Sequence, residues 1–339
     1  KKNILNTIYT YTREKKNCLK MNTITTSLHY LNKKYVNEKV AGESVFTEGG
    51  HRSDSLPHDV TIYNGRLLDN SIAGEKRLDK SGFLLHSIGN NLYETIKEID
   101  MPQIETDEIL RLKYYNVIEK VVMNATKCDY VRAFNFTLRS SKIIGVHTKA
   151  VGDNSARGPV NDVHTDFTPT APAVVSIAQL SDSLGLKSCR FSLLNCWRNI
   201  DLKNPILHWP MAICDVNSID HEHDLIPRIS PENGNHIYNL LPNKQHKWYT
   251  FPAQTAKEIL LFKQYDTIDH LRCYTPHTAF NDPRSPKNAP PRNSCEVRCI
   301  CWFDDEGKFT DSFKILHEKN IGLISNRVEM RIYGNKSKL

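Results

Sequence analysis

A histidine and an aspartate two positions apart, His164 and Asp166, place the strongest constraint on how this chain can fold. Side chains alternate along a β-strand, so these two point to the same side of an extended segment. With a second histidine from elsewhere in the chain, they would form a set of two imidazoles and one carboxylate. Such a set binds Fe(II) on one face and leaves other positions open. A histidine and an aspartate spaced in this way can also lie at the end of a strand without binding a metal.

The preferred second histidine is His277, which lies in the sequence Tyr-Thr-Pro-His-Thr-Ala-Phe at residues 274–280. A Pro- and Asn-rich loop follows, and the β-branched and aromatic run after it predicts a strand at 292–303. His270 is the alternative, but it forms a polar pair with Asp269 and lacks the surroundings of His277. The sequence therefore favours a metal site made of His164, Asp166 and His277.

The predicted strand at 292–303 offers a face that can bind a carboxylate. On an uninterrupted strand this face carries Arg292, Ser294, Glu296, Arg298, Ile300 and Trp302. Arg292 can grip a carboxylate by two parallel hydrogen bonds, and the Ser294 hydroxyl can add a third. Arg298 is the competing anchor. Its neighbour Glu296 offers it an ion pair, which a buried charge needs, so a structural role is the alternative for both.

Five blocks of sequence carry a resemblance to a known family. They are Cys-Trp-Arg at 196–198, Pro-Met-Ala-Ile-Cys-Asp at 210–215, His-Lys-Trp-Tyr-Thr-Phe-Pro at 246–252, Glu-Ile-Leu-Leu-Phe-Lys-Gln-Tyr-Asp at 258–266 and Thr-Pro-His-Thr-Ala-Phe at 275–280. Together they resemble the fungal and bacterial hydroxylase/desaturase family, which includes gibberellin desaturase-like enzymes and proteins similar to a cephalosporin methoxylase subunit. The resemblance extends over residues 60–303, most of the chain.

The resemblance implies a mainly β fold with flanking helices (α+β), built on a double-stranded β-helix of the jelly-roll, cupin-like type. It implies a non-haem iron, 2-oxoglutarate-dependent dioxygenase that uses Fe(II), 2-oxoglutarate and O₂. Such an enzyme would hydroxylate or desaturate a small molecule of secondary metabolism. The expected metal-binding and catalytic residues are His164, Asp166 and His277, and the expected cosubstrate-binding residues are Arg292, Ser294, Arg298 and Asn195.

Two further polar residues lie on predicted strands. Asn195 shares one face of the strand at 190–198 with Trp197. A buried amide there suits a hydrogen bond to the cosubstrate, with a structural role as the alternative, and Trp197 is expected in the core. Arg139 follows the strand at 129–136 and is expected to be a surface or structural residue. A reach into the site is the alternative for Arg139.

The main alternative function is a non-catalytic partner subunit of a small-molecule tailoring enzyme, because a fold can persist without its chemistry. The complete triad and the Arg-x-Ser pair count against it. The net charge of +7, from 45 basic and 38 acidic residues, is modest, and no basic stripe with interleaved aromatic residues indicates nucleic-acid binding. The expected partner is a small-molecule substrate, not nucleic acid or a membrane. The oligomeric state is not indicated.

Composition bears on the expected compartment. No apolar run approaches the roughly 18 residues that a membrane span needs, and the first residues lack the apolar core of a signal peptide. The nine cysteines form no Cys-x-x-Cys pair, and their odd number favours reduced thiols over a disulfide framework. We therefore expect a cytoplasmic protein.

The chain is expected to divide into an N-terminal tail and lead-in segment, residues 1–58 and partly disordered, and a single oxygenase domain at 59–339. Met21 is the expected native start. Apolar spacing predicts helices at 92–99 and 105–123, a short helix at 173–180 and a closing helix at 313–318. The segment 220–236 does not match the family. Its acidic part, with His221 and His223, is expected to be a solvated loop and not a metal site.

Overall fold

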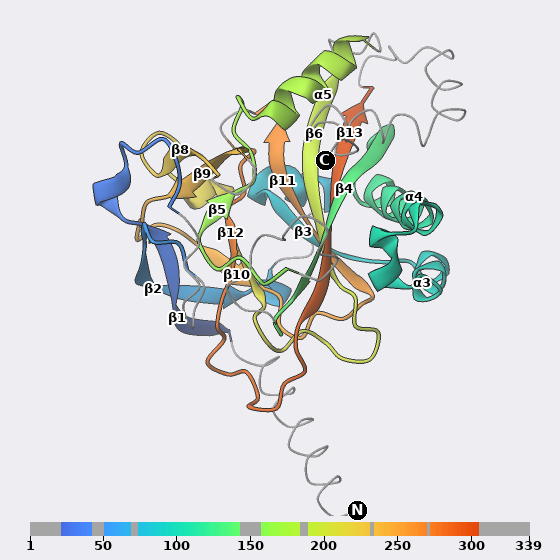
Figure 1. Cartoon of the computed structure of the whole chain (residues 1–339), viewed down its shortest axis with the longest axis horizontal. Coiled ribbons are helices and arrows are strands. Elements are labelled where there is room, and N and C mark those ends of the chain that lie inside the picture. The colour runs from blue at the N-terminus through green and yellow to red at the C-terminus, as the bar shows by residue number, and fades with distance from the viewer. Residues whose placement is uncertain are drawn as a thin grey trace, which may run out of the picture.

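Strands dominate the computed structural model, which describes residues 22–42, 51–68, 74–142, 157–183, 189–230, 234–269 and 272–304 (Figure 1). They form an eight-stranded sheet in the order β1-β2-β10-β7-β12-β5-β9-β8 and a five-stranded sheet in the order β3-β11-β6-β13-β4. The larger sheet contains β1 (Thr23–Leu31), β2 (Ser55–Asn64), β5 (His164–Thr165), β7 (Met211–Cys214), β8 (Leu225–Ile229), β9 (His236–Leu240), β10 (Trp248–Thr250) and β12 (His277–Ala279). The smaller contains β3 (Phe83–Ser87), β4 (Tyr130–Ser140), β6 (Arg190–Asn199), β11 (Glu258–Asp266) and β13 (Asn293–Phe303).

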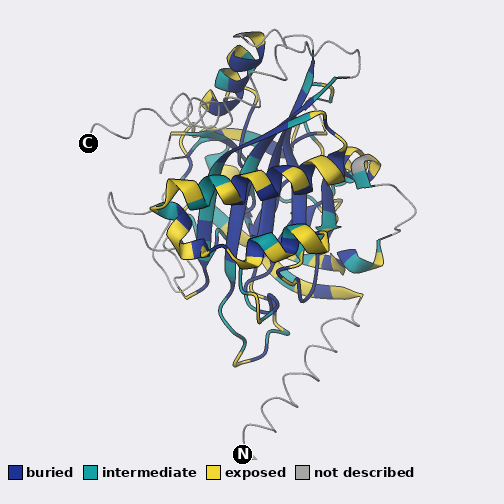
Figure 2. Ribbon diagram, turned by 90° about the vertical axis from the view of Figure 1, so that its right-hand side faces the viewer, coloured by how far each residue is buried: buried dark blue, intermediate teal, exposed yellow. Residues whose placement is uncertain are grey.

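Three of the four described α-helices fall where apolar spacing predicts them, and the first, at 74–81, was not predicted. The four are α2 (Gly74–Ser81), α3 (Asn90–Lys97), α4 (Glu108–Thr126) and α5 (Pro172–Ser183), with short 3-10 turns η1 (Lys33–Tyr35), η2 (Gly65–Leu67), η3 (Met101–Glu105) and η4 (Val216–Ser218). The Asp107 side chain caps α4 by accepting from the Leu110 amide at 2.9 Å. α3 and α4 lie across the outer face of the five-stranded sheet, with their buried sides toward it (Figure 2).

Strand alternation divides the smaller sheet into two apolar faces. On β13, Ile300 and Trp302 pack in a core that both sheets share, whereas Cys295, Cys299 and Cys301 pack with the helices on the other side. The alternation predicted from the sequence for this strand is therefore confirmed. The three cysteines are free thiols buried in an apolar layer, where they pack as small apolar residues.

The N-terminal part differs from the sequence-based expectation. Residues 23–31, predicted within the lead-in segment, form β1 and pair antiparallel with β2, from Thr23 opposite Tyr63 to Leu31 opposite Ser55. The predicted boundary between residues 58 and 59 falls inside β2. The strand was missed because its buried residues, such as Ile24 and Leu28, are separated by threonine and serine and give a weak apolar alternation. The single-domain assignment stays a prediction.

Several expectations concern residues outside the described ranges, namely Met21 as the start, the closing helix at 313–318 and His270 as an alternative ligand. Within the described ranges, none of the helices combines the length and the apolar character needed to cross a membrane. The cytoplasmic location stays a prediction.

Candidate metal centre

The three predicted metal ligands come together on two paired strands of the larger sheet. His164 of β5 lies directly opposite His277 of β12, and their ring centroids are 4.5 Å apart. Asp166 follows β5 on the same side as His164, as the two-residue spacing predicts. One ligand atom from each of the three residues lies within 4.8 Å of the others. Across the described residues, no other group of three His, Cys, Asp or Glu side chains comes together in this way.

The two histidines have a defined tautomer that suits a metal. His164 Nδ1 lies 2.7 Å from the carbonyl oxygen of Asp162, and His277 Nδ1 lies 3.2 Å from that of Thr275. A carbonyl oxygen can only accept, so both Nδ1 atoms carry the proton and both Nε2 atoms keep a lone pair. Burial, and next the neighbouring His277 ring, lower the pKa of His164 to about 3, so this imidazole is neutral at physiological pH.

One carboxylate oxygen of Asp166 is held by the protein and the other faces the histidines. Oδ2 accepts from Asn195 Nδ2 and lies 3.1 Å from an Arg298 nitrogen. Oδ1 lies 3.7 Å from His164 Nε2. Burial by itself would raise the pKa of Asp166, but Arg298 and the two histidines outweigh it and lower that pKa below its ordinary value. The site therefore offers two Nε2 lone pairs and one carboxylate oxygen, the donor set that Fe(II) accepts.

A cavity beside the three residues contains the predicted cosubstrate anchor. Its lining includes Arg139, Trp197, Arg292 and Glu296 together with the three candidate ligands. The Arg292 side chain donates to the carbonyl oxygen of Trp209 at 2.7 Å, and its Nε has no hydrogen-bond partner among the described residues. Burial lowers the pKa of Arg292 to about 9, which still leaves the group charged at neutral pH. A buried, charged and incompletely bonded guanidinium is suited to an anionic ligand.

Ser294 supports the same interpretation. It is 1% exposed, and its hydroxyl has no hydrogen-bond partner among the described residues. It lies two residues after Arg292 and directly opposite Arg139 of β4. Arg139, expected at the surface or in a structural role, instead lines the cavity and donates to the Gly158 carbonyl at 2.7 Å. The alternative interpretation, in which Arg139 reaches the site, therefore agrees better with the structure.

Arg298 is placed differently from Arg292. Its guanidinium contacts Asp166 at 3.1 Å and Glu296 at 3.7 Å. The ion pair with Glu296 that the sequence suggested is present, but the shorter contact is to the candidate metal ligand. Burial, and next the negative charge of Asp166, raise the pKa of Glu296. Arg298 therefore lies between two carboxylates, and Arg292 is the better placed of the two arginines to receive a ligand in the cavity.

Asn195 and Trp197 project inward from β6 on the predicted face. The Asn195 amide donates to Asp166, so it touches a candidate metal ligand, and its Oδ1 has no partner among the described residues. Trp197, expected in the core, lines the cavity, and the Arg292 guanidinium lies over its ring at 5.6 Å. The size and apolar character of Trp197 predict from the sequence that it is buried. They do not distinguish a place in the core from a place in the wall of a cavity, because an aromatic ring is buried in both.

Two residues that the sequence did not single out hold the backbone of Asp166. The Asp166 amide donates to Gln264 Oε1 at 2.7 Å, and its carbonyl accepts from Asn235 Nδ2 at 2.6 Å. Gln264 sits in the block at 258–266, and Asn235 belongs to the segment 220–236 that could not be matched. Asn235 therefore links this segment to the site, and the strand that follows it, β9, pairs with β5, with His164 opposite Asn239. No motif in the sequence marks either contact.

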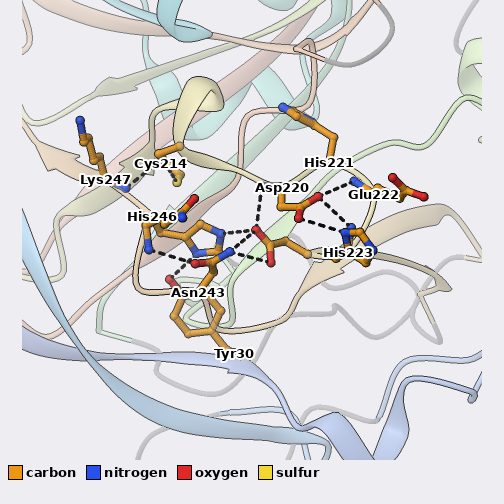
Figure 3. A network of polar contacts seen from close by, with 12 residues as sticks. Tyr30, Cys214, Asp220, His221, Glu222, His223, Asn243, His246 and Lys247 are labelled. Atoms are coloured by element: carbon orange, nitrogen blue, oxygen red, sulfur yellow. Dashed lines mark hydrogen bonds and ion pairs between the residues drawn. The ribbon is translucent and has the colours of Figure 1, made fainter.

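The second histidine- and aspartate-rich region forms a separate hydrogen-bond network, in which Asp224 accepts from His246, Asn243 and the Asp220 amide. Figure 3 shows His246, Asn243 and Asp220 in this network. His223, 73% exposed at its side chain, pairs with Asp220 at 2.9 Å, and His221 Nε2 donates to the Val216 carbonyl at 3.0 Å. No three of these groups meet as possible metal ligands within the part of the chain that is described. The expectation of a solvated loop in place of a metal site stays a prediction.

Comparisons with known proteins now identify the family. Residues 28–302 match the family model described as "YDMC: Oxidoreductase/YMDC permease-like domain". The chain belongs to this family. The hydroxylase/desaturase efuI of Hormonema carpetanum is 29% identical over 254 residues, covering 69% of this chain and 81% of that protein. The Fe(II)/2-oxoglutarate-dependent dioxygenase nvfI of Aspergillus novofumigatus is 29% identical over 258 residues, covering 73% and 84%.

A solved structure agrees with the family match and with the named relatives. The iron and alpha-ketoglutarate-dependent endoperoxidase NvfI superposes with a TM-score of 0.62 and 26% identity, over 83% of this chain and 98% of that one. The predicted jelly-roll fold is confirmed by this likeness. The resemblance to hydroxylases and desaturases, drawn from five blocks of sequence, is confirmed by the named relatives.

Proposed function

We propose that this protein is an Fe(II)/2-oxoglutarate-dependent oxygenase that hydroxylates or desaturates a small molecule. The observation that carries the proposal is the group formed by His164, Asp166 and His277, whose possible ligand atoms lie within 4.8 Å of one another. Both imidazoles present Nε2, and the carboxylate presents Oδ1 toward them. The named relatives, which include hydroxylase/desaturases and 2-oxoglutarate-dependent dioxygenases, support the same chemistry.

In this proposal His164, Asp166 and His277 hold the iron. Bound there with 2-oxoglutarate and O₂, the iron would supply the oxidation of a substrate C–H bond, with 2-oxoglutarate converted to succinate and CO₂. Arg298 and Asn195 orient Asp166 and keep its carboxylate ionised, so that Oδ1 stays directed at the metal position. Fixed outer partners of this kind commonly change metal affinity 10–100-fold when they are removed.

We assign the far carboxylate of 2-oxoglutarate to Arg292 and Ser294. Arg292 lines the cavity directly before β13, and Ser294 lies on the inner side of β13. Each has a buried polar atom without a hydrogen-bond partner among the described residues. Arg139 is a second guanidinium at the same cavity, so it can add to the positive potential there. Asn195 Oδ1 is the remaining candidate for direct cosubstrate contact, because its amide nitrogen is already engaged by Asp166.

The substrate is proposed to be a small molecule of secondary metabolism, which rests on the activities named for the relatives. The alternative, a non-catalytic partner subunit, would not need both histidine Nε2 atoms and an ionised carboxylate to face one position. It would also not need a buried arginine with an open donor beside them. These features favour the enzyme.

The proposal is tested by anaerobic titration of purified protein with Fe(II) and then 2-oxoglutarate, followed by exposure to O₂. We expect a weak visible charge-transfer band to appear only when both are bound, and slow succinate formation after O₂ is admitted. Asp166→Ala serves as the matched control and should give neither signal. A wild-type protein that binds neither iron nor 2-oxoglutarate would favour the partner-subunit function instead.

A further inference from the structure

A β-bulge in β11 carries Gln264 toward the candidate metal centre. The pairing of β11 with β6 runs regularly from Ile259 to Lys263, then shifts so that Tyr265, and not Gln264, takes the next position. Bulges insert one residue without a cross-strand partner, and near active sites they redirect a side chain. Phe262 and Tyr265 contact the inner residues His277 and Tyr274, although they are three residues apart. Gln264 lies between them and is 0% exposed.

The side-chain amide of Gln264 is hydrogen-bonded through both its oxygen and its nitrogen. Its Oε1 accepts from the Asp166 amide at 2.7 Å, and its Nε2 donates to the carbonyl oxygens of Thr275 at 3.1 Å and Lys263 at 3.0 Å. The reversed orientation would set an NH₂ group against an N–H and an oxygen against two carbonyls. The contacts therefore define the orientation of this amide.

These contacts join the two segments that carry the metal ligands. Gln264 holds the backbone of Asp166 on one side and the carbonyl of Thr275 on the other. The same Thr275 carbonyl accepts from His277 Nδ1 at 3.2 Å. One buried side chain thus contacts the peptide group of one ligand and the oxygen that orients another. We propose that Gln264 is a positioning residue that sets the separation of Asp166 and His277, an inference that rests on the proposed metal site.

The pairing of β5 with β12 gives Asp166 little support. β5 contains two residues, and its pairing with β12 consists of the single pair His164 and His277. Asp166 lies past the end of that pairing, so the β5–β12 ladder does not determine its distance from His277. The Gln264 amide supplies a direct link between the Asp166 and Thr275 backbones in its place.

Hydrogen bonds to Gly82 hold the backbone next to the bulge in place. The Gly82 carbonyl accepts from the Lys263 amide at 2.8 Å and from the Thr275 hydroxyl at 3.1 Å. Gly82 has φ +84°, and a Cβ at this position would lie 2.5 Å from the Thr275 hydroxyl oxygen, so a larger residue does not fit. Lys263 also pairs with Asp266 at 2.7 Å, across the bulge. The backbone that carries Gln264 is therefore held in position by these contacts.

The experiment compares Co(II) binding to the full chain for wild type, Gln264→Met and Gln254→Met. Gln254 is a matched control because it is also a buried glutamine, 2% exposed, and its side chain donates to the Glu258 carbonyl at 3.4 Å, away from both ligand segments. We expect Gln264→Met to raise the Kd for Co(II) by about 10–100-fold and to change the visible Co(II) spectrum. Gln254→Met should lower the melting temperature while keeping wild-type Kd and spectrum.

A second variant, Gln264→Asn, covers the case in which Gln264→Met does not fold. It keeps the amide but shortens its reach by one carbon–carbon bond, about 1.5 Å, so it cannot span both partners. A folded Gln264 variant with wild-type Co(II) affinity and spectrum overturns the positioning role. A wild-type protein that fails to bind Co(II) instead contradicts the proposed metal site, so the two failures are distinguishable.

Discussion

Two regions of this molecule are rich in histidine and aspartate, yet within the described residues only one brings three possible ligand atoms together. At β5 and β12 the histidines use Nδ1 to bond to backbone carbonyls, which leaves both Nε2 atoms facing Asp166. Around Asp224 the ring nitrogens of His246 are both engaged, Nε2 with Asp224 at 3.0 Å and Nδ1 with the Tyr30 hydroxyl at 3.1 Å (Figure 3). Metal-binding capacity therefore depends on whether the fold brings several open ligand atoms to one point.

The local backbone conformation explains much of the difference between these two regions. His164 and Asp166 are two apart at the end of a strand, so their side chains converge on one side. Asp220 and Asp224 lie in a turn, where their carboxylates accept from backbone amides, Asp220 Oδ1 from Glu222 and Asp224 Oδ2 from Asp220. Carboxylates used in this way stabilise the turn.

The largest effect is expected from Asp166→Ala compared with Asp220→Ala. The first change removes one of three proposed protein ligands, so iron binding and 2-oxoglutarate turnover should be abolished while unfolding stays cooperative. The second should leave both at wild-type levels. Iron content after gel filtration and succinate formation are the measurements. Wild-type activity in Asp166→Ala would contradict the triad.

His277→Ala should also lose iron, whereas His223→Ala should retain it. His277 presents a buried Nε2 toward Asp166 and His164, while His223 is exposed and pairs with a surface carboxylate. His270→Ala, at the alternative ligand position suggested by the sequence, should behave like His223→Ala. The readout is Fe(II) stoichiometry. If only the His270 variant fails to bind iron, the assignment of His277 is wrong.

Arg292→Gln should weaken 2-oxoglutarate binding selectively. Truncating one partner of a buried, charge-assisted pair costs on the order of 2–5 kcal/mol. At about 1.4 kcal/mol per decade, this is roughly 30-fold to several thousand-fold in Kd. Ser294→Ala should cost less, on the order of 1 kcal/mol. Arg298→Gln should weaken iron binding first, because Arg298 contacts Asp166. Titrations of iron and 2-oxoglutarate separate the three variants, and a loss of 2-oxoglutarate binding confined to Arg298→Gln would move the anchor there.

Asp224→Asn should lower stability without changing iron affinity. Asp224 accepts from His246, Asn243 and the Asp220 amide, and an Asn would turn a donor toward some of these donors. Leaving such a buried group unsatisfied costs about 1–3 kcal/mol. Urea denaturation measures this loss, and iron titration is the control. A weaker iron affinity in this variant would mean that the two regions are coupled.

The smallest effect is expected at the exposed pair of His223 and Asp220. The hydrogen bond between them raises the pKa of His223 and lowers that of Asp220. The His223 contribution to stability is present at low pH and is lost as pH rises through its folded pKa. The Asp220 contribution is present at higher pH and is lost as pH falls through its folded pKa. The melting-temperature difference between wild type and His223→Gln should therefore be greatest between those two pKa values. A pH-independent difference would exclude this linkage.

Much of the site was predictable because it depends on local geometry. The spacing of His164 and Asp166, the alternation along residues 292–303 and the context of His277 each concern a few consecutive residues. The main differences concern single contacts across the fold. Arg298 bonds to Asp166, Trp197 lines the cavity in addition to packing in the core as predicted, and β1 joins the sheet although its apolar pattern is weak.

The sequence by itself determined the ligand types, the spacing that puts His164 and Asp166 on one side, and the family, since these follow from short-range alternation and from blocks of recognisable residues. Only the tertiary structure decided which oxygen of Asp166 stays open, which arginine lines the cavity, and that a bulge directs Gln264 between the two ligand segments. Each of these depends on a hydrogen bond or ion pair between residues far apart in the chain, such as Asn195 with Asp166. Contacts of that kind leave no periodic pattern in a sequence, because they arise only when folding brings the strands together.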